Sequence, residues 1–236
     1  MSRHELITWS DAVGAVTAPA LAIISDATAA SARARLAAAE RAGLMRSCRP
    51  LADAGALYVP TRAGLREFGL SGSPQPAPGA GIASHSALCA VVAARLQRAY
   101  PRGRVIGEAA LRRLERACGR SVASAELIHG AEGRSQVHRP DLVLWAGTAA
   151  SGLPMAVEVE LTVKGAVRLS AICRAWARAH CVAGVIYLVS PEAAAPVAAA
   201  VEHANAAERV SSLPLAALEG ADSWLPALER TVAVRA

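Results

Sequence analysis

The sequence predicts a mixed α and β protein (α+β) with two domains, and three observations lead to this fold class. A Pro- and Gly-rich stretch, SGSPQPAPGAG at residues 71–81, is typical of a linker. Helical patterns and one short hairpin pattern precede it, and strand-like runs flanked by helical patterns follow it. We therefore expect a first domain over 1–70, a linker over 71–82, a second domain over 83–215 and a C-terminal tail over 216–236.

The composition is that of a folded protein with a basic balance. Hydrophobic residues make up 53% of the 236 residues, and the formal net charge is +6. A basic balance is compatible with a nucleic-acid partner. Five scattered cysteines without a C-x-x-C pair indicate reduced thiols and a cytoplasmic protein. No run approaches the 18 or more apolar residues that span a bilayer, so we expect no membrane partner.

The first domain is expected to contain helices and one hairpin. Thr28 follows a short turn and can cap a helix, Gly43 stands where that helix ends, and Thr61 can cap another. The expected elements, in order, are helices over 5–16 and 17–24, a helix through 32–43, strands over 44–48 and 56–59, and a last helix ending at 69.

This order resembles the winged helix-turn-helix domain over nearly all of residues 1–70. In such domains the helix after the turn lies in the major groove of double-stranded DNA, and the wing contacts phosphates. The residues that the resemblance assigns to DNA are Thr28, Ser31, Arg33 and Arg35 on that helix, and Arg46 and Arg49 on the wing. Since this domain has eight arginines against six acids, solvated arginines and a protein-binding role stay open as alternatives.

The second domain is predicted to contain helices that alternate with strands. The expected elements are helices over 84–100 and 108–118, strands over 122–128, 137–145 and 155–163, a helix over 167–181, a strand over 184–189, a helix over 192–207 and a strand over 210–213.

The run MAVEVELTVK (residues 155–164) is the most informative segment of this domain. On a strand, its odd positions place only apolar side chains on one face. Its even positions place Glu158, Glu160 and, if the strand continues, Lys164 on the other face. Two such carboxylates lie about 7 Å apart on one face and repel each other unless positive charge is near. A divalent metal ion is one solution, and Lys164 is another.

A further acid precedes a neighbouring apolar run, HRPDLVLW at residues 138–145. If this strand pairs with the next one, Asp141 comes near Glu158 and Glu160. His138 lies just before Asp141 and could touch a phosphate or a metal site, although a structural role is the more common one for a single histidine.

Together with the element order, these residues resemble the PD-(D/E)xK nuclease superfamily and its αβββαβ core. The resemblance implies metal-dependent hydrolysis of DNA phosphodiesters. It implies that Asp141 and Glu158 hold Mg²⁺ (or Mn²⁺), and that Glu160 ligates the metal or acts on the attacking water. Lys164 would stabilise developing charge. Glu108, at a helix start, matches a metal-binding acid that some members contribute from their first helix.

The lysine departs from the usual spacing of that superfamily. The lysine usually follows the glutamate by two residues, where this chain has Glu160, and Lys164 comes four residues later, directly before Gly165. Lys164 is also the only lysine beside 24 arginines, and a compact ammonium fits small sites where guanidinium does not. The alternative for Glu158 and Glu160 is a solvated sheet face with surface ion pairs to Lys164 and Arg168.

The whole chain is similar to the replication-relaxation family of plasmid and mobile-element proteins over about residues 15–190. The matching segments are SHSALCAVVAARLQRAYP, GEAALRRLE, HRPDLVLW and VEVELTVKG. We therefore expect a DNA-binding protein with a metal-dependent endonuclease-like domain acting on plasmid or mobile-element DNA. The alternatives are a non-catalytic regulator, whose second domain serves homodimerisation or partner binding, and an RNA- or protein-binding adaptor.

Overall fold

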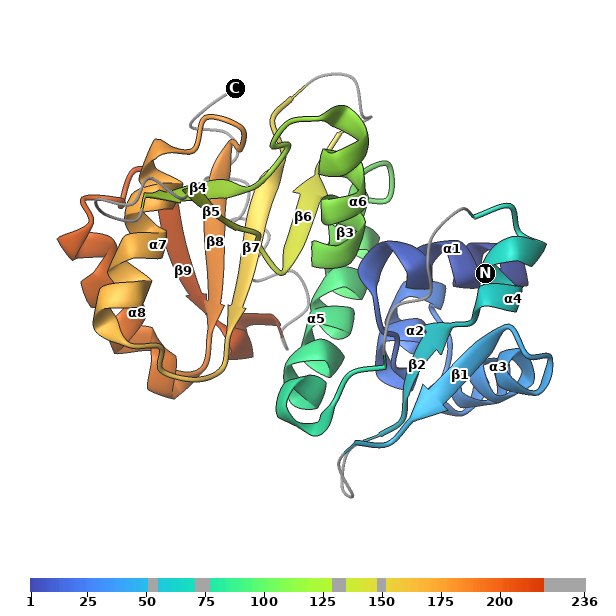
Figure 1. Ribbon diagram of the computed structural model, residues 1–236. Helices are drawn as coiled ribbons and strands as arrows, with labels where there is room; N and C mark the ends of the chain where they lie inside the picture. Colours follow the sequence, from blue (N-terminus) through green and yellow to red (C-terminus); the bar gives the residue numbers. More distant parts are fainter. Residues whose placement is uncertain (51–54, 71–76, 129–134, 148–151, 219–236) are drawn as a thin grey trace. The chain divides into compact units, whose positions relative to one another are not determined.

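The computed structural model describes residues 1–50, 55–70, 77–128, 135–147 and 152–218 (Figure 1). The chain divides into two compact units. Unit 1 comprises Met1–Pro101 and Val105–Ala110, and unit 2 comprises Arg102–Arg104 and Leu111–Ala236. The division falls later than the expected linker at 71–82, because the helix that follows this segment packs against unit 1.

Unit 1 contains the order of elements expected for residues 1–70, followed by one long helix. Strands β1 and β2 pair antiparallel, with Met45 opposite Pro60 and Cys48 opposite Leu57. The elements are α1 (Arg3–Val13), α2 (Ala18–Ser25), α3 (Ala29–Arg41), β1 (Met45–Cys48), β2 (Leu57–Pro60), α4 (Arg62–Glu67) and α5 (Ala80–Ala99).

Local side-chain caps define where these helices begin. The Thr28 hydroxyl accepts the backbone N–H of Ser31 at 3.2 Å, and the Thr61 hydroxyl accepts that of Gly64 at 3.0 Å, so both predicted caps are confirmed. Helix α1 begins earlier than predicted because Ser2 and Glu5 form a reciprocal capping box.

Several predicted helix ends were wrong, including those of α7 (Ala166–Arg178) and α8 (Pro191–His203), which were predicted to end at 181 and 207. Helix α1 ends at Val13 rather than at Val16, since Gly14 has a φ of 107° and Val16 pairs with Tyr58 of β2. Helix α5 begins at Ala80, four residues before the predicted start, which shortens the expected linker. Residues 71–76 of that linker lie outside the described residues.

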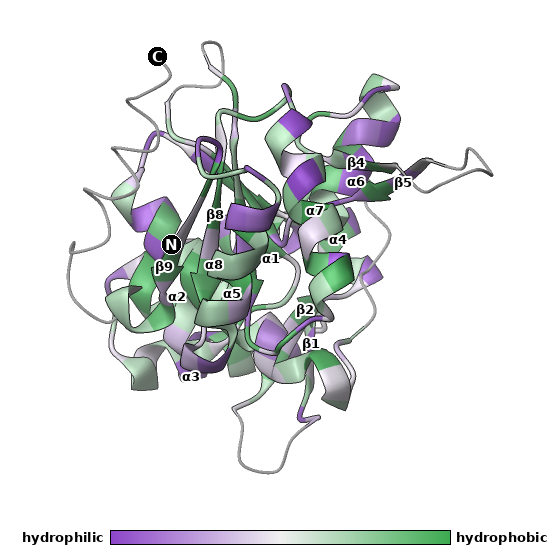
Figure 2. Ribbon diagram, turned by 90° about the vertical axis from the view of Figure 1, so that its left-hand side faces the viewer, coloured by the Kyte–Doolittle hydropathy of each residue, from purple (hydrophilic) through white to green (hydrophobic). Residues whose placement is uncertain are grey.

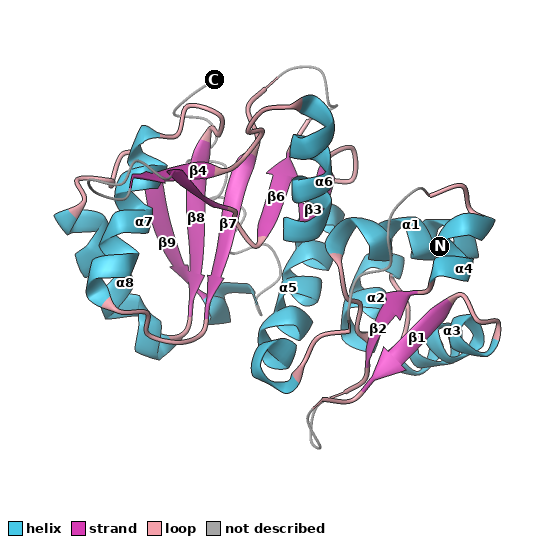
Figure 3. Cartoon of the chain, viewed as in Figure 1, coloured by secondary structure: helices cyan, strands magenta, loops and turns pink. Residues whose placement is uncertain are grey.

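Unit 2 is built on a mixed sheet with the strand order β3-β6-β7-β8-β9 (Figure 3). Strand β3 is the segment in which the division between the units falls. The elements after α5 are β3 (Arg104–Gly107), α6 (Glu108–Cys118), β4 (Ala125–Ile128), β5 (Ser135–His138), β6 (Leu142–Trp145), β7 (Met155–Glu160), α7 (Ala166–Arg178), β8 (Gly184–Val189), α8 (Pro191–His203), β9 (Val210–Pro214) and the 3-10 turn η1 (Leu215–Leu218).

The chain connections set the direction of each strand in the sheet. Strands β6 and β7 are antiparallel, whereas β7, β8 and β9 are parallel because α7 and α8 carry the chain back between them. Helices α7 and α8 pack against each other beside these strands. Strand β8 is buried throughout, as expected for a central parallel strand, and its residues are mostly hydrophobic (Figure 2).

The mixed α and β fold class is confirmed, and the strand ends were partly wrong. The single strand predicted over 137–145 is two strands, because Arg139, Pro140 and Asp141 interrupt it and β5 pairs with β4 in a separate small sheet. The strand predicted over 155–163 ends at Glu160. Strand β3 was not predicted, and the expected tail over 216–236 is described only as far as Leu218.

No helix in the described parts of the chain has the length and apolar character needed to cross a membrane.

Candidate functional site

The predicted DNA-reading residues of α3 all lie on the surface of unit 1. Thr28, Ser31, Arg33 and Arg35 are exposed, while Leu36 of the same helix is fully buried. The buried side, formed by Ala32, Leu36 and Ala39, fixes the orientation of the helix, so that the four predicted residues face solvent. This exposure satisfies the first requirement for contact with a DNA groove.

The exposed side of α3 carries positive charge without a competing acid. Arg33, Arg35 and Arg41 are exposed. The one acid of the helix, Glu40, instead accepts hydrogen bonds from the Ser47 hydroxyl at 2.6 Å and the Ser47 backbone N–H at 3.0 Å. These bonds hold the pKa of Glu40 below its usual value of 4.5.

The two predicted wing arginines are also exposed. Arg46 lies on β1 opposite Val59, and Arg49 follows the end of that strand. Residues 51–54 lie outside the described residues. The described part of the wing therefore presents both basic side chains at the surface.

The carboxylates of β7 are not on a solvated face. Glu158 and Glu160 are each only 3% exposed, and every residue of the strand is buried. The alternative of a solvated sheet face is therefore wrong. Two buried carboxylates on one strand need compensating charge or hydrogen bonds from the protein.

Glu158 obtains its partners from two other elements. His138 Nε2 lies 2.6 Å from Glu158 Oε1, and the Trp176 Nε1–H donates to the same oxygen at 3.1 Å. The imidazole and indole rings also meet edge to face, with centroids 5.6 Å apart. β5 and α7 thus hold the carboxylate of β7 in place.

Asp141 lies beside Glu158, as the predicted strand pairing required. Leu142 pairs with Val157, which places Asp141 next to Glu158 at the end of the β6–β7 ladder. The Asp141 Oδ2 accepts the backbone N–H of Val159 at 2.8 Å. The structure therefore brings together the aspartate and the glutamate that were predicted to act as a pair.

Glu160 is paired with the only lysine of the chain. Lys164 lies four residues beyond the end of β7, in the segment that leads to α7, and its ammonium donates to Glu160 Oε2. The Glu160 side chain is 5% exposed and that of Lys164 is 32% exposed. Lys164 is therefore not on the strand face, but it still reaches the carboxylate.

Burial dominates the electrostatics of this cluster. It raises the pKa of the Glu158 carboxyl, a shift that the hydrogen bond from His138 opposes and the charge of Asp141 reinforces. Burial also raises the pKa of the Cys173 thiol to about 11 and the pKa of the Tyr187 hydroxyl well above 10.0. A new negative charge is therefore costly throughout this part of unit 2.

The cluster does not form a ready metal site. Mg²⁺ gathers several oxygen ligands around one point, yet in the described residues Asp141, Glu158 and Glu160 do not offer three ligand atoms within 4.8 Å of one another. Glu158 is already hydrogen-bonded to His138 and Trp176, and the ammonium of Lys164 already pairs with Glu160. Glu108 begins α6 within unit 1, so it is described apart from these residues.

Sequence reasoning missed how Glu158 is held. The sequence favours a structural role for His138 and does not indicate a role for Trp176. The signal for His138 was its position just before the segment Arg139-Pro140-Asp141. Trp176 gave no such signal, because it lies 18 residues from Glu158 in sequence and meets it only through the packing of α7.

Comparison of the chain with known protein families, with curated proteins and with solved structures gave no match.

Proposed function

We propose that the protein binds double-stranded DNA through unit 1, with α3 in the major groove and the β1–β2 wing on the phosphate backbone. The observation that carries this proposal is that three arginines of α3 are exposed, Arg33, Arg35 and Arg41, while the one acid of the helix is bonded to Ser47. Arginine is suited both to bidentate contacts with guanine and to phosphate.

The small residues of α3 support the same role. Ala29, Ala30 and Ala34 are exposed beside Ser31 and Arg33. Short side chains allow a helix to approach base edges closely, and the long arginines can then extend along the groove.

We propose that unit 2 acts without catalysis, as the partner-binding or dimerising part of a regulator. Its carboxylates already have partners within the protein: Glu158 is hydrogen-bonded to His138 and Trp176, and Glu160 pairs with Lys164. Metal-dependent hydrolysis would require at least Glu158 to exchange a close partner for an ion, at a position that is 3% exposed. The arrangement therefore does not fit a Mg²⁺ centre.

The DNA-binding proposal is tested by titrating the full chain into fluorescently labelled duplexes. Arg33→Gln and Arg35→Gln should each weaken binding about 5- to 150-fold, as expected for a base contact of about 1–3 kcal/mol. Arg66→Gln is the matched control, since Arg66 is exposed on α4. Equal losses in all three variants, or no duplex binding by the unaltered protein, would refute the assignment of α3.

The non-catalytic role is tested by calorimetric titration with Mn²⁺ and Mg²⁺, followed by incubation with plasmid and linear DNA. We expect neither metal binding nor cleavage. Asp141→Asn and Glu158→Gln serve as comparison variants, because they keep the shape of each side chain. Metal binding and cleavage that both disappear in these variants would show a nuclease and overturn the proposal.

A further inference from the structure

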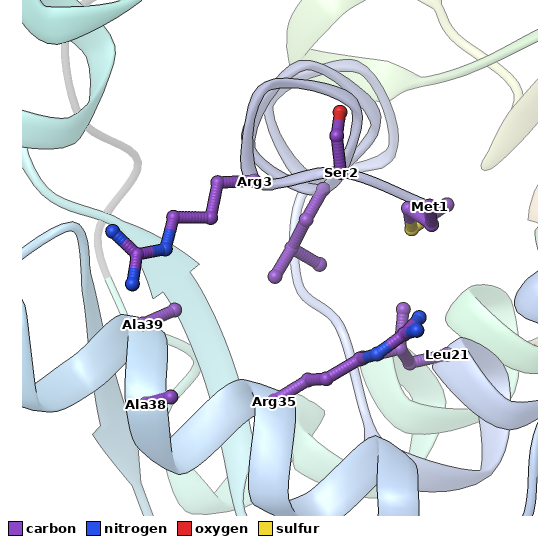
Figure 4. A pocket seen from close by; sticks show the side chains of 8 residues that line it. Met1, Ser2, Arg3, Leu21, Arg35, Ala38 and Ala39 are labelled. Carbon is purple, nitrogen blue, oxygen red and sulfur yellow. The ribbon is translucent and has the colours of Figure 1, made fainter.

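A pocket of about 180 Å³ opens in unit 1 between the start of α1 and the side of α3 (Figure 4). Its apolar wall is formed by Leu6, Leu21, Ala38 and Ala39. Leu6, Leu21 and Ala39 are at most 5% exposed, so this wall belongs to the packed interior of the unit. The two alanines leave the space because they have no side chain beyond Cβ.

The size of the pocket matches one small ring. An engineered apolar cavity of roughly 150 Å³ is known to bind benzene. The pocket in unit 1 is slightly larger and is open on one side, so a ring with one substituent can enter it. It is too small for a nucleotide or a peptide segment of several residues.

The mouth of the pocket is positively charged. Arg3 extends from α1 across Ala39, and Arg35 extends from α3 toward Leu21 (Figure 4). Within the described part of the chain, neither guanidinium forms an ion pair or a hydrogen bond with a protein group. The nearest acid along α1, Glu5, is occupied by the backbone N–H of Ser2 at 2.5 Å.

We propose that this pocket binds a small aromatic carboxylate. The ring would pack against Leu6, Leu21 and the alanines, and the carboxylate would accept hydrogen bonds from Arg35, with Arg3 adding a second positive charge at the mouth. An uncharged ring would leave both guanidiniums unpaired, and a free inorganic anion would leave the apolar wall unused. The combination of the two features selects a ligand that has both parts.

Occupation of the pocket would also affect DNA binding, an effect that rests on the proposed function. Arg35 is one of the side chains expected to contact DNA. A carboxylate that holds Arg35 at the pocket competes with that contact, so ligand and duplex should each weaken the binding of the other by the same factor.

The test is calorimetric titration of the full chain with benzoate, with benzyl alcohol as the uncharged comparison. We expect saturable binding of benzoate and binding of benzyl alcohol that is weaker by about tenfold or more, the size of one charge-assisted hydrogen bond. Absence of saturable benzoate binding, or equal binding of both compounds, would overturn the proposal.

Two pairs of variants locate the site. Ala38→Leu fills the pocket and should abolish benzoate binding, whereas Ala34→Leu places the same side chain at an exposed position of α3 and should not. Arg35→Gln should weaken benzoate binding about tenfold, whereas Arg33→Gln should leave it unchanged. Arg35 is at the surface, so its variant keeps the test valid if Ala38→Leu fails to fold.

Unchanged benzoate binding in Arg35→Gln would overturn the proposal. These measurements contain no DNA, so they stand apart from the proposed function. Benzoate binding by a protein that does not bind duplex DNA would support the site and refute the proposed function.

Discussion

The pKa values of two buried glutamates of unit 2 are shifted in opposite directions, because their hydrogen-bond partners differ in number. Glu115 accepts hydrogen bonds from Val122, Ala123 and Ser124 and pairs with Arg139 at 3.0 Å. Burial alone would raise its pKa, but these partners outweigh burial and lower the pKa below 4.5. Glu158 has fewer partners and a raised pKa.

We expect Glu115→Gln to lower the free energy of unfolding by about 2 kcal/mol near neutral pH, because the amide cannot accept the same charge-assisted bonds. The lowered pKa means that the Glu115 contribution is present above the unfolded value of 4.5 and is lost as the pH falls through the folded pKa. The difference between the two proteins should therefore shrink in acid.

The Glu115 prediction is checked by urea unfolding at several pH values. Glu126→Gln is the control, because Glu126 is an exposed acid on β4 and its replacement should change little. A difference between wild type and Glu115→Gln that is constant with pH would contradict the prediction.

Glu158→Gln should show the opposite dependence on pH. A raised pKa in the folded state means that the folded protein holds this proton more tightly than the unfolded chain does. The stability that this provides is complete below 4.5 and is lost as the pH rises through the folded pKa. Glutamine does not titrate, so the variant should gain stability relative to the wild type as the pH rises.

Thermal unfolding of both proteins between about pH 4 and pH 8 measures this effect. If the variant loses stability relative to the wild type over that range, the ionised pair of Glu158 and His138 stabilises the fold more than burial destabilises it.

At the scale of single elements, one glycine sets how closely α4 can approach the turn before β1. A Cβ built on Gly64 would lie 2.2 Å from the backbone oxygen of Leu44 and 2.9 Å from its carbonyl carbon. Both are backbone atoms, so a small side-chain movement cannot relieve the contact. Thr61 fixes this approach from the other side by donating its hydroxyl to the oxygen of Gly43 at 2.6 Å.

Gly64→Ala should therefore destabilise the protein by about 1–3 kcal/mol, as an overpacked position does. Gly81→Ala on α5 is the matched control, since a Cβ there meets no atom within 4 Å. The control should be neutral or stabilise slightly, because alanine favours helix. Chemical denaturation of both variants compares them directly, and equal stabilities would show that unit 1 adapts to the added methyl group.

Elements with a strong local signal were predicted well from the sequence. Helix α6 and strand β8 have the predicted ends, because an amphipathic run and an apolar run each stop at clear breaks. Strand β3 has only four residues between a Pro- and Gly-containing turn and a helix, too few for a periodic pattern. The break between β5 and β6 depends on Arg139 reaching Glu115, a contact with a residue 24 positions away.

In the candidate sites, too, local patterns were predicted from the sequence and contacts between distant residues were not. Alternation along β7 predicted that Glu158 and Glu160 share a face, and pairing with β6 brought Asp141 to them. Alternation could not predict that α7 covers this face, because that depends on the packing of a helix that follows in sequence. The repulsion between Glu158 and Glu160 led to the prediction of a metal ion. In the structure, Glu158 is instead hydrogen-bonded to His138, and Glu160 pairs with Lys164.

At the scale of the whole molecule, the proposed DNA binding should depend strongly on salt, because each phosphate that a basic side chain neutralises releases counterions. The logarithm of the association constant should fall linearly with the logarithm of the salt concentration. Replacing Arg46 and Arg49 together with glutamine should reduce the magnitude of that slope by about 0.9 for each phosphate that the variant no longer neutralises.

Duplex titrations at several salt concentrations give the slope for the wild type and for the wing variant. Arg33→Gln serves as the comparison, because a base contact should change affinity more than slope. An unchanged slope in the wing variant would place the phosphate-binding residues elsewhere on the protein.

The fluorescence of the Trp176 indole can report on the interior of unit 2. It is fully buried, donates its N–H to Glu158 and meets the ring of His138 edge to face. Fluorescence from an indole changes with the charge and hydrogen bonding around it. Loss of a proton from Glu158 should therefore alter the emission of Trp176, and a light signal would report an ionisation that takes place out of reach of solvent.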